Sequence, residues 1–354
     1  MLFTRHARNP LITPRETKPS QPGFEVIGTF NAGVTQSGSE TILLLRVAER
    51  PLQTDPDWLQ YSYVDAHGDL VVRAIRRDDP AYDLSDPRLI IRRSTGLIAL
   101  SSVSHLRLAR SKDGIAFEIA DQPWFRPHPG YECFGVEDAR ITPIDGAYFV
   151  NYSAVSPLGI STALVSTRDF IHVERHGIIF PPANRDVTIF PERIGGMYVC
   201  YHRPMPGMFG GLNMWVATSP DLIRWGDHRL LAETRHAAWE AGRIGGGAPP
   251  IRTDGGWLSI YHAADEQNRY CLGALLTALD DPARILARSP EPVLKPEADY
   301  ETGGFFANVV FTCGALVEGD RLRVYYGASD EVTALAEAPL NSILDLLDDA
   351  STPT

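Results

Sequence analysis

One pattern recurs along this chain and limits the folds that it can adopt: an apolar run, a tight turn and a second apolar run. The turns are Asp145-Gly146, Gly195-Gly196, Asp254-Gly255 and Gly319-Asp320. Asp-Gly and Gly-Gly pairs between apolar runs are typical of β-hairpins. Their separation of about fifty to sixty residues is the spacing of repeated four-stranded blades. The repeat predicts an all-β protein made of similar units.

A second short element follows each hairpin: a small polar residue, an aspartate and an apolar anchor. It occurs as "SKDGIAF" from Ser111, "STRDFIHV" from Ser166 and "SPDLIRW" from Ser219, and it predicts a turn before an outer strand. Residues 37–49 are predicted to form the inner strand of a first unit. Counting these units indicates a five-bladed β-propeller in a single domain over residues 1–354, with a pair of β-sandwiches as the alternative. An amphipathic run in the tail, about residues 335–354, predicts a short C-terminal helix.

Composition excludes several classes of protein. The net charge is −11, so general nucleic-acid binding is not expected. No run approaches the ~20 apolar residues of a membrane helix, and the first residues lack the apolar core of an export signal. The four cysteines lie outside C-x-x-C spacing, which argues against zinc and favours free thiols in a reducing compartment. We therefore expect a cytoplasmic protein without a metal.

The stretch "YECFGVEDARITPIDGAYFVNYSAV" places two carboxylates side by side, Glu137 and Asp138, before a predicted hairpin. Successive side chains of a strand point to opposite faces. The alternation therefore predicts that only one of the two carboxylates faces a site and that the other turns toward structural partners.

Other units carry polar residues in corresponding places, and in a propeller these would converge at the strand ends. Any single one has a simpler explanation, because a buried arginine usually forms a structural ion pair and a lone histidine is usually a hydrogen-bonded core residue. Together, several cations in an acidic chain favour a local phosphate site. The candidates are Asn31, Arg46, Arg185, His202, Arg203, Glu240, Arg243, His262 and Asp330.

The segments "GVEDARIT", "NRDVTIFPERIGGMYVCYHRP", "GGGAPPI" with "GGWLSIYH", and "NVVFTCGAL" with "YYGASD" resemble glycoside hydrolase family 130. These are the β-mannoside phosphorylases and their β-1,2-mannosidase relatives. The resemblance extends over residues 9–336 and implies a five-bladed propeller. It implies that Asp138 is the catalytic acid and thus the carboxylate of the pair that faces the site, so we expect Glu137 to turn toward structural partners. It implies that Arg185, Arg203, Arg243 and His262 hold phosphate. It also implies that Asn31, Arg46 and Asp330 hold the mannosyl unit.

The sequence therefore favours an inverting phosphorylase, in which phosphate replaces the second carboxylate that a glycosidase needs. Its expected ligands are a β-manno-oligosaccharide or mannosyl disaccharide and inorganic phosphate, without an organic cofactor. An inverting β-mannosidase with Glu240 as base is the first alternative, and a non-catalytic sugar-binding propeller is the second. The linkage, the acceptor sugar and a homo-oligomeric state stay open.

Overall fold

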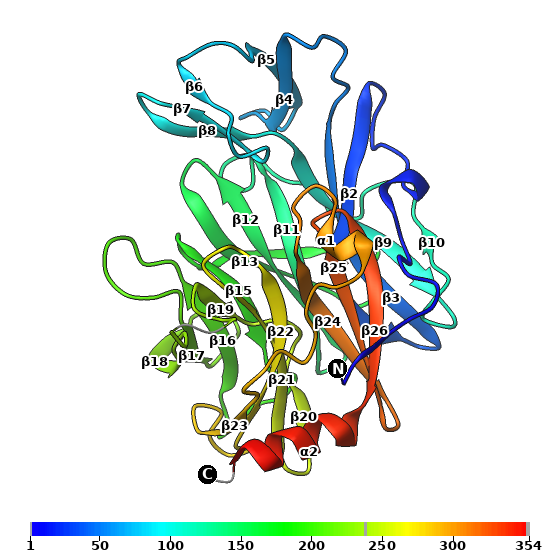
Figure 1. Ribbon diagram of the computed structural model, residues 1–354, viewed down its shortest axis with the longest axis vertical. Helices are drawn as coiled ribbons and strands as arrows, with labels where there is room; N and C mark the ends of the chain where they lie inside the picture. Colours follow the sequence, from blue (N-terminus) through cyan, green and yellow to red (C-terminus); the bar gives the residue numbers. More distant parts are fainter. Residues whose placement is uncertain (1, 237–238, 352–354) are drawn as a thin grey trace.

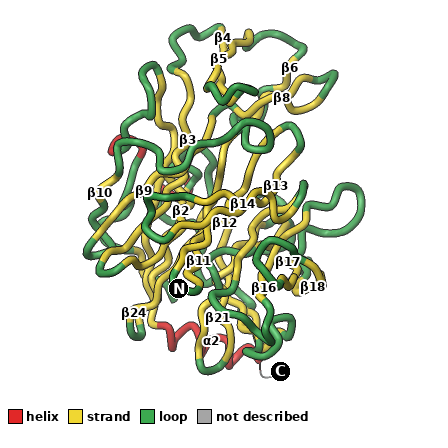
Figure 2. Tube along the Cα trace, turned by 180° about the vertical axis from the view of Figure 1, so that it is seen from behind, coloured by secondary structure: helices red, strands yellow, loops and turns green. Residues whose placement is uncertain are grey.

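The computed structural model describes residues 2–236 and 239–351 and is built almost entirely of β-strands (Figures 1 and 2). The predicted all-β class is confirmed. The helices described are short: η1 (Pro14–Glu16), α1 (Asp299–Thr302) and the C-terminal α2 (Leu340–Ser351). No helix in these two ranges is long and apolar enough to cross a membrane.

The largest sheet consists of two antiparallel units joined by one parallel contact, where Gly135 pairs with Ser104. A Cβ on Gly135 would lie 2.7 Å from the backbone nitrogen of Ser104, and the residue has φ +130°, so glycine is required at this junction. The first unit comprises β2 (Phe24–Ser37), β3 (Glu40–Pro51), β9 (Val103–Ser111) and β10 (Glu118–Ile119). The second comprises β11 (Gly135–Ile144), β12 (Ala147–Ser156), β13 (Gly159–Thr167) and β14 (Glu174–Phe180).

Three further antiparallel sheets follow along the chain. One contains β15 (Asn184–Ile189), β16 (Tyr198–Pro204), β17 (Met214–Ser219) and β18 (Gly226–Ala232). The next contains β19 (Arg243–Gly245), β20 (Ile251–Thr253), β21 (Gly256–Ala264), β22 (Tyr270–Thr277) and β23 (Ile285–Arg288). The last contains β24 (Val310–Glu318), β25 (Arg321–Ala328), β26 (Val332–Pro339) and the N-terminal β1 (Thr4–Arg5).

All four predicted hairpin turns join paired strands as expected. The predicted turns before outer strands are also present. In each, an aspartate accepts two backbone N–H bonds; these residues are Asp113, Asp169 and Asp221. The prediction that residues 37–49 form an inner strand is wrong, because β3, which contains most of these residues, is the second strand of its sheet. The innermost strand is β2, which packs on β11 and β24.

The central strands are buried on both faces, because every sheet packs against two neighbours. Leu322 and Val324 of β25 belong to a core shared with β21 and β22, whereas Tyr325, the residue after Val324, joins a core shared with β2 and β3. Because successive side chains point to opposite faces, one strand contributes side chains to two separate cores. This packing holds the inner strands close to one another.

One segment lies outside the repeat. Between β3 and β9 the chain forms a hairpin, β4 (Trp58–Val64) and β5 (Leu70–Arg76), and a small sheet, β6 (Tyr82–Asp83), β7 (Leu89–Arg92) and β8 (Gly96–Leu100). We call residues 52–102 the insertion. It stands at the top of Figure 1, above the main body.

The C-terminal helix is present, but it begins later than predicted. Residues 335–339 belong to β26, where Leu335 pairs with Tyr325 and is buried, and the helix starts at Leu340. Ile343 and Leu347 then pack the helix on the core of the last two sheets. Residues 352–354 of the predicted tail lie outside the described residues.

Candidate active site

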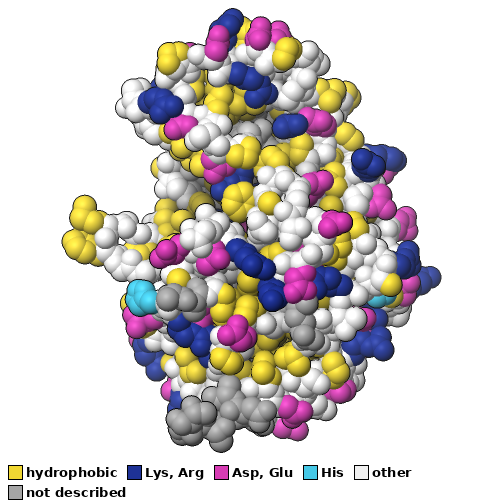
Figure 3. Space-filling view, viewed as in Figure 1, with side chains coloured by type: hydrophobic (Ala, Val, Ile, Leu, Met, Phe, Trp, Pro, Cys, Tyr) yellow, Lys and Arg dark blue, Asp and Glu magenta, His cyan; other side chains and the backbone are white. Residues whose placement is uncertain are grey.

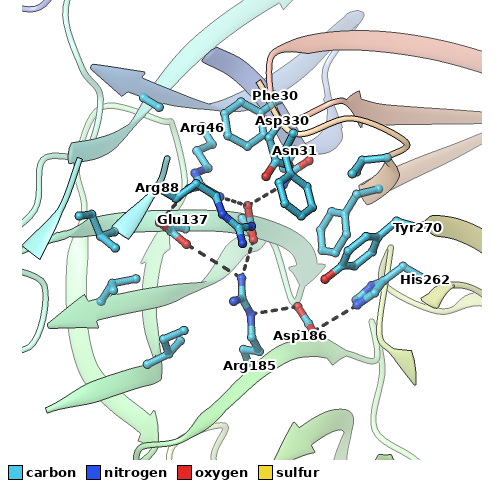
Figure 4. Close-up of a pocket in the computed structure, with 18 of the residues that line it drawn as sticks. Phe30, Asn31, Arg46, Arg88, Glu137, Arg185, Asp186, His262, Tyr270 and Asp330 are labelled. Carbon is cyan, nitrogen blue, oxygen red and sulfur yellow. Dashed lines mark hydrogen bonds and ion pairs between the residues drawn. The ribbon is translucent and has the colours of Figure 1, made fainter. Parts of the chain in front are cut away.

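The inner ends of the sheets surround a cavity of about 400 Å³ (Figure 4). Eight predicted site residues line it, and they come from β2, β3, β11, β15, β16, β19, β21 and the turn after β25. These residues are Asn31, Arg46, Asp138, Arg185, Arg203, Arg243, His262 and Asp330. The convergence that the repeat predicted is therefore present.

Four short polar residues around the cavity share an unusual backbone conformation. Asn31, Asp138, Asp186 and Asp330 have φ values of 49°, 52°, 58° and 53°. Asparagine and aspartate tolerate this left-handed region better than other non-glycine residues. At the first three, the strand register shifts by a bulge. Bulges re-aim side chains, and here they turn one polar residue per unit into the cavity.

Asp138 is buried and accepts three hydrogen bonds. Its Oδ1 accepts from Asn31 Nδ2 at 2.9 Å and from Arg46 Nη1 at 3.1 Å. Its Oδ2 accepts from Arg185 Nη2 at 3.1 Å. Burial opposes ionisation of this carboxyl, but the charges of Arg46 and Arg185 outweigh burial and hold its pKa below the ordinary value. Asp138 is thus ionised in this state.

The prediction that Glu137 turns away from the site is wrong. Glu137 lines the same cavity, and its Oε1 accepts from Arg46 Nη2 at 2.8 Å. The bulge between Glu137 and Arg140 breaks the alternation on which the prediction rested. Both neighbouring carboxylates therefore face the cavity and share Arg46.

The opposite side of the cavity is rich in cations grouped around Asp186. Arg203 donates to Asp186 Oδ2 from Nε at 2.9 Å and from Nη2 at 2.5 Å. Arg140 donates to its Oδ1 at 3.4 Å, and Arg185 Nε lies 3.7 Å from the same oxygen. Despite burial, these neighbours hold the pKa of Asp186 well below its ordinary value. The carboxylate fixes the guanidinium groups around the cavity.

Several buried nitrogen atoms on this side have no hydrogen-bond partner among the described residues. They are Arg185 Nε, Arg243 Nε and the two ring nitrogens of His262. His262 Nε2 lies 3.2 Å from Asp186 but lacks hydrogen-bond geometry. Because buried polar groups are normally paired, these atoms indicate a polar ligand. We call Arg185, Arg203, Arg243 and His262 the cationic cluster; its charge comes from the three arginines, because burial lowers the pKa of His262.

Asp330 behaves differently from Asp138. Burial raises its pKa from the ordinary 3.8 to about 6, aided by the negative charge of Asp138 and opposed by Arg46 and Arg88. The cavity therefore holds two aspartates that stay ionised, Asp138 and Asp186, and a third, Asp330, that titrates closer to neutrality. Figure 4 shows Asp330 beside Asn31 and Phe30, on the side away from His262.

Two predicted site residues do not line the cavity. Glu240 is fully buried elsewhere, where it accepts hydrogen bonds from Arg235, Arg288 and Tyr261. His202 bonds to Asn184 and His228 and stacks on Phe180 at 4.7 Å. Both are held by structural partners, so neither is a substrate contact in this arrangement.

Residues that the sequence interpretation missed also line the cavity. Asp186 stands next to Arg185 in the "NRD" motif, and that adjacency was the available signal. Tyr270 receives a hydrogen bond from Arg243 Nη1 at 2.9 Å. Arg88 comes from the insertion and lies 4.1 Å from the ring centre of Phe306. No repeat pattern marks Arg88, because the insertion is outside the repeat.

The face of the molecule in Figure 3 carries charges of both signs, because acidic and basic side chains are interspersed over it. The loop between β16 and β17 projects from this face with an apolar tip, and Met208 and Phe209 on it are 90% and 83% exposed. Met205 and Leu212, at the base of the same loop, line the cavity. The arginines of the cavity are thus not part of a larger basic patch on this face.

Comparisons with known proteins agree with this geometry. Residues 96–349 match the glycoside hydrolase family 130 profile, described as β-1,4-mannooligosaccharide phosphorylase. The chain is 47% identical over 351 residues to a β-1,2-mannobiose phosphorylase of Listeria innocua, covering 98% of this chain and 99% of that protein. It is 40% identical over 244 residues to a 1,2-β-oligomannan phosphorylase of Thermoanaerobacter sp., covering 68% and 80%.

A solved structure extends the similarity to three dimensions. The β-1,2-mannobiose phosphorylase of Listeria innocua, in complex with β-1,2-mannobiose, superposes with a TM-score of 0.96 over 99% of this chain and 100% of that chain. The resemblance identified from the sequence motifs is confirmed. This chain belongs to glycoside hydrolase family 130.

Proposed function

We propose that this chain is an inverting phosphorylase that removes a terminal β-1,2-linked mannosyl unit and produces α-mannose 1-phosphate. The reaction class predicted from the sequence, phosphorolysis of β-mannosides, is confirmed by the relatives, whose names are those of mannoside phosphorylases. The observation that carries the proposal is the cavity itself. It joins the ionised Asp138 to the cationic cluster, in which several buried nitrogens have no hydrogen-bond partner among the described residues.

The proposed roles follow from the two sides of the cavity. Phosphate binds to the cationic cluster, whose unpaired nitrogens would donate to its oxygens. Asn31, Arg46 and Asp330 position the mannosyl unit. Asp138 lies between the two groups, where it can serve as the general acid for the leaving oxygen. Attack by phosphate on the face of the sugar opposite the leaving group inverts the anomeric centre.

The β-1,2 linkage is favoured by the relatives. The protein that is 47% identical over nearly the whole chain and the one that is 40% identical both bear β-1,2 names, whereas a β-1,4-mannooligosaccharide phosphorylase of Ruminococcus albus is 32% identical. We assign the acceptor sugar to the side formed by Arg88 and Phe306, because an aromatic face and a guanidinium suit a hydroxylated ring.

The hydrolase alternative loses its proposed base. Glu240 is tied to Arg235 and Arg288 outside the cavity. Glu137 is a cavity carboxylate, but its Oε1 is held in an ion pair with Arg46 at 2.8 Å. We therefore retain phosphorolysis.

Four further features are part of the proposal. The five antiparallel units form a five-bladed propeller, closed by the pairing of β1 with β26. The reaction uses inorganic phosphate as co-substrate and needs no organic cofactor or metal. The location is cytoplasmic, which the four free thiols support. A homo-oligomeric state stays a prediction.

The test is the phosphate requirement. With β-1,2-mannobiose, we expect α-mannose 1-phosphate and mannose in equal amounts, no cleavage without phosphate, and slower cleavage of β-1,4-mannobiose. The Asp138→Asn variant should lose ~10²–10⁴-fold in rate while still binding the mannoside. Free mannose as the sole product at equal rates with and without phosphate would support hydrolysis. Unchanged turnover in Asp138→Asn would remove this residue from the acid role.

A further inference from the structure

A general acid must carry a proton before it can donate one, and the surroundings of Asp138 oppose this. Three donors point at its two oxygens: Asn31 Nδ2, Arg46 Nη1 and Arg185 Nη2, at 2.9, 3.1 and 3.1 Å. Two of them are guanidinium groups, which stabilise the carboxylate. One of these contacts has to weaken before Asp138 can hold a proton.

Arg46 and Asn31 are fixed in place. Arg46 also donates to Glu137 at 2.8 Å and to Ser104 at 3.1 Å, and its guanidinium lies 4.6 Å from the ring centre of Phe30. Asn31 is 3% exposed within β2. All of these contacts are made with residues outside the cationic cluster, and the one link to it is long, 4.0 Å from Glu137 Oε2 to Arg185 Nη2. A ligand on the phosphate side therefore leaves them in place.

Arg185 is the contact that a ligand can draw away. Its side chain is 22% exposed, against 15% for Arg46. Its Nε has no hydrogen-bond partner among the described residues, and its pairing with Asp186 is loose at 3.7 Å. Figure 4 shows Arg185 between the carboxylates above it and Asp186 beside it. One side chain thus belongs to both the acid and the cluster.

We propose that Arg185 couples phosphate binding to protonation of Asp138. Bound phosphate takes over the Arg185 guanidinium, and Asp138, having lost this partner, takes up from solvent the proton that it later donates. This inference rests on the proposed phosphorylase function. Arg185 is then a positioning residue that keeps the acid unprotonated until the co-substrate is present.

The other charges near Asp138 support the direction. Arg46 on β3 and Arg140 on β11 remain and favour ionisation. Glu137 on β11 and Asp330 after β25 line the same cavity, and negative charge on a neighbouring carboxyl favours protonation of Asp138. Cys313 on β24 stays a neutral thiol, because burial raises its pKa. Phosphate adds negative charge and withdraws one positive partner, and both changes raise the pKa of Asp138.

The protons balance over the reaction. Protonated Asp138 gives its proton to the glycosidic oxygen as the C1–O bond breaks, and a phosphate oxygen forms the new bond to C1. Hydrogen phosphate brings one proton, which returns to solvent when mannose 1-phosphate leaves as the dianion. The proton that Asp138 took up therefore ends on the acceptor hydroxyl.

Calorimetric titration of inorganic phosphate in two buffers of different ionisation enthalpy measures the protons taken up per phosphate bound. It is carried out with and without mannose in the sugar site. The titration of phosphate itself is common to all variants, so the difference between the unmodified protein and Asp138→Asn reports this residue. We expect the unmodified protein to take up more protons, by up to one.

Two truncations provide the matched comparison. Arg185→Ala and Arg243→Ala each remove one cation of the cluster, and both should weaken phosphate binding about tenfold to a hundredfold. Arg243→Ala should keep the extra proton uptake. Arg185→Ala should lose most of it, because Asp138 lacks this partner before phosphate arrives.

Three results would overturn the coupling. These are equal uptake in the unmodified protein and Asp138→Asn, equal loss in the two arginine variants, or uptake that survives in Asp138→Asn and disappears in Asp330→Asn. The last result would assign the proton to Asp330. In each case phosphate-dependent formation of α-mannose 1-phosphate would still stand, whereas a phosphate-independent release of mannose would refute the proposed function itself.

Discussion

At the scale of single residues, the cavity depends on short polar side chains in a backbone conformation that most residues avoid. These residues are Asn31, Asp138, Asp186 and Asp330, and each has a positive φ and a side chain that lines the cavity. Strained backbone of this kind persists where the surrounding structure holds it, and it often occurs at functional sites. The same residues therefore serve the local fold and the proposed chemistry.

Asp330 is where this double role should affect stability. Its pKa is raised from 3.8 to about 6 in the folded state, so the folded state binds its proton more tightly than the unfolded state does. Stability is therefore lost as the pH rises from about 4 through about 6. Asp330→Asn removes this penalty and should raise the free energy of unfolding by up to roughly 3 kcal/mol near neutral pH.

Urea denaturation across this pH range measures the effect. The gain should shrink toward zero below about pH 4, where the carboxyl is protonated in both states. Phosphorolysis should fall in the same variant, which would be a trade of activity for stability. A gain that is independent of pH, or a loss at neutral pH, would contradict the assigned titration.

At the scale of elements, the hairpins could be predicted because their signals are local. Asp145-Gly146 and the similar turns need only four neighbouring residues to specify their shape. Side-chain direction near Glu137 could not be predicted, because a bulge depends on the partner strand and reverses the alternation. Arg88 could not be found because the insertion has no second copy in the chain with which to compare it. Glu240 was wrongly placed in the site because no sequence motif marks its ion-pair partners, Arg235, which is five residues away, and Arg288, which is 48 residues away.

The junction between the two halves of the largest sheet gives an element-scale prediction. Gly135→Ala introduces a Cβ 2.7 Å from the Ser104 nitrogen at φ +130°. We expect a loss of roughly 2–5 kcal/mol in the free energy of unfolding, from backbone strain and steric overlap together. Denaturant melts of the two proteins measure it.

Gly130→Ala is the matched control, because Gly130 also has a positive φ, +87°, but no atom lies within 4 Å of the added Cβ. It should cost only roughly 1–2 kcal/mol, from the backbone term. Equal losses at the two positions would show that close contact at the junction is unimportant.

At the scale of the whole molecule, the two ends of the chain are joined. β1 pairs with β26, and Arg5 Nε donates to the buried carboxylate of Glu301 at 2.7 Å. Arg5→Ala removes the arginine that pairs with this carboxylate and leaves the buried charge poorly compensated. The free energy of unfolding should therefore fall by about 3–5 kcal/mol.

The exposed pair of Arg76 and Asp78 serves as the comparison, at 2.8 Å on the insertion. Arg76→Ala should change the free energy of unfolding by no more than about 1 kcal/mol, because solvent screens exposed pairs. Thermal melts of the two variants measure the difference. Similar shifts in both would mean that joining the ends adds little.

Joining the ends also orders events during synthesis. Thr4 and Arg5 are made long before their partners Ala336 and Glu337. The last sheet therefore cannot be completed until β26 has been made. A nascent chain carries β1 without its partner strand until that point. The full cavity, which needs Asp330 after β25, cannot be assembled before this late residue is present.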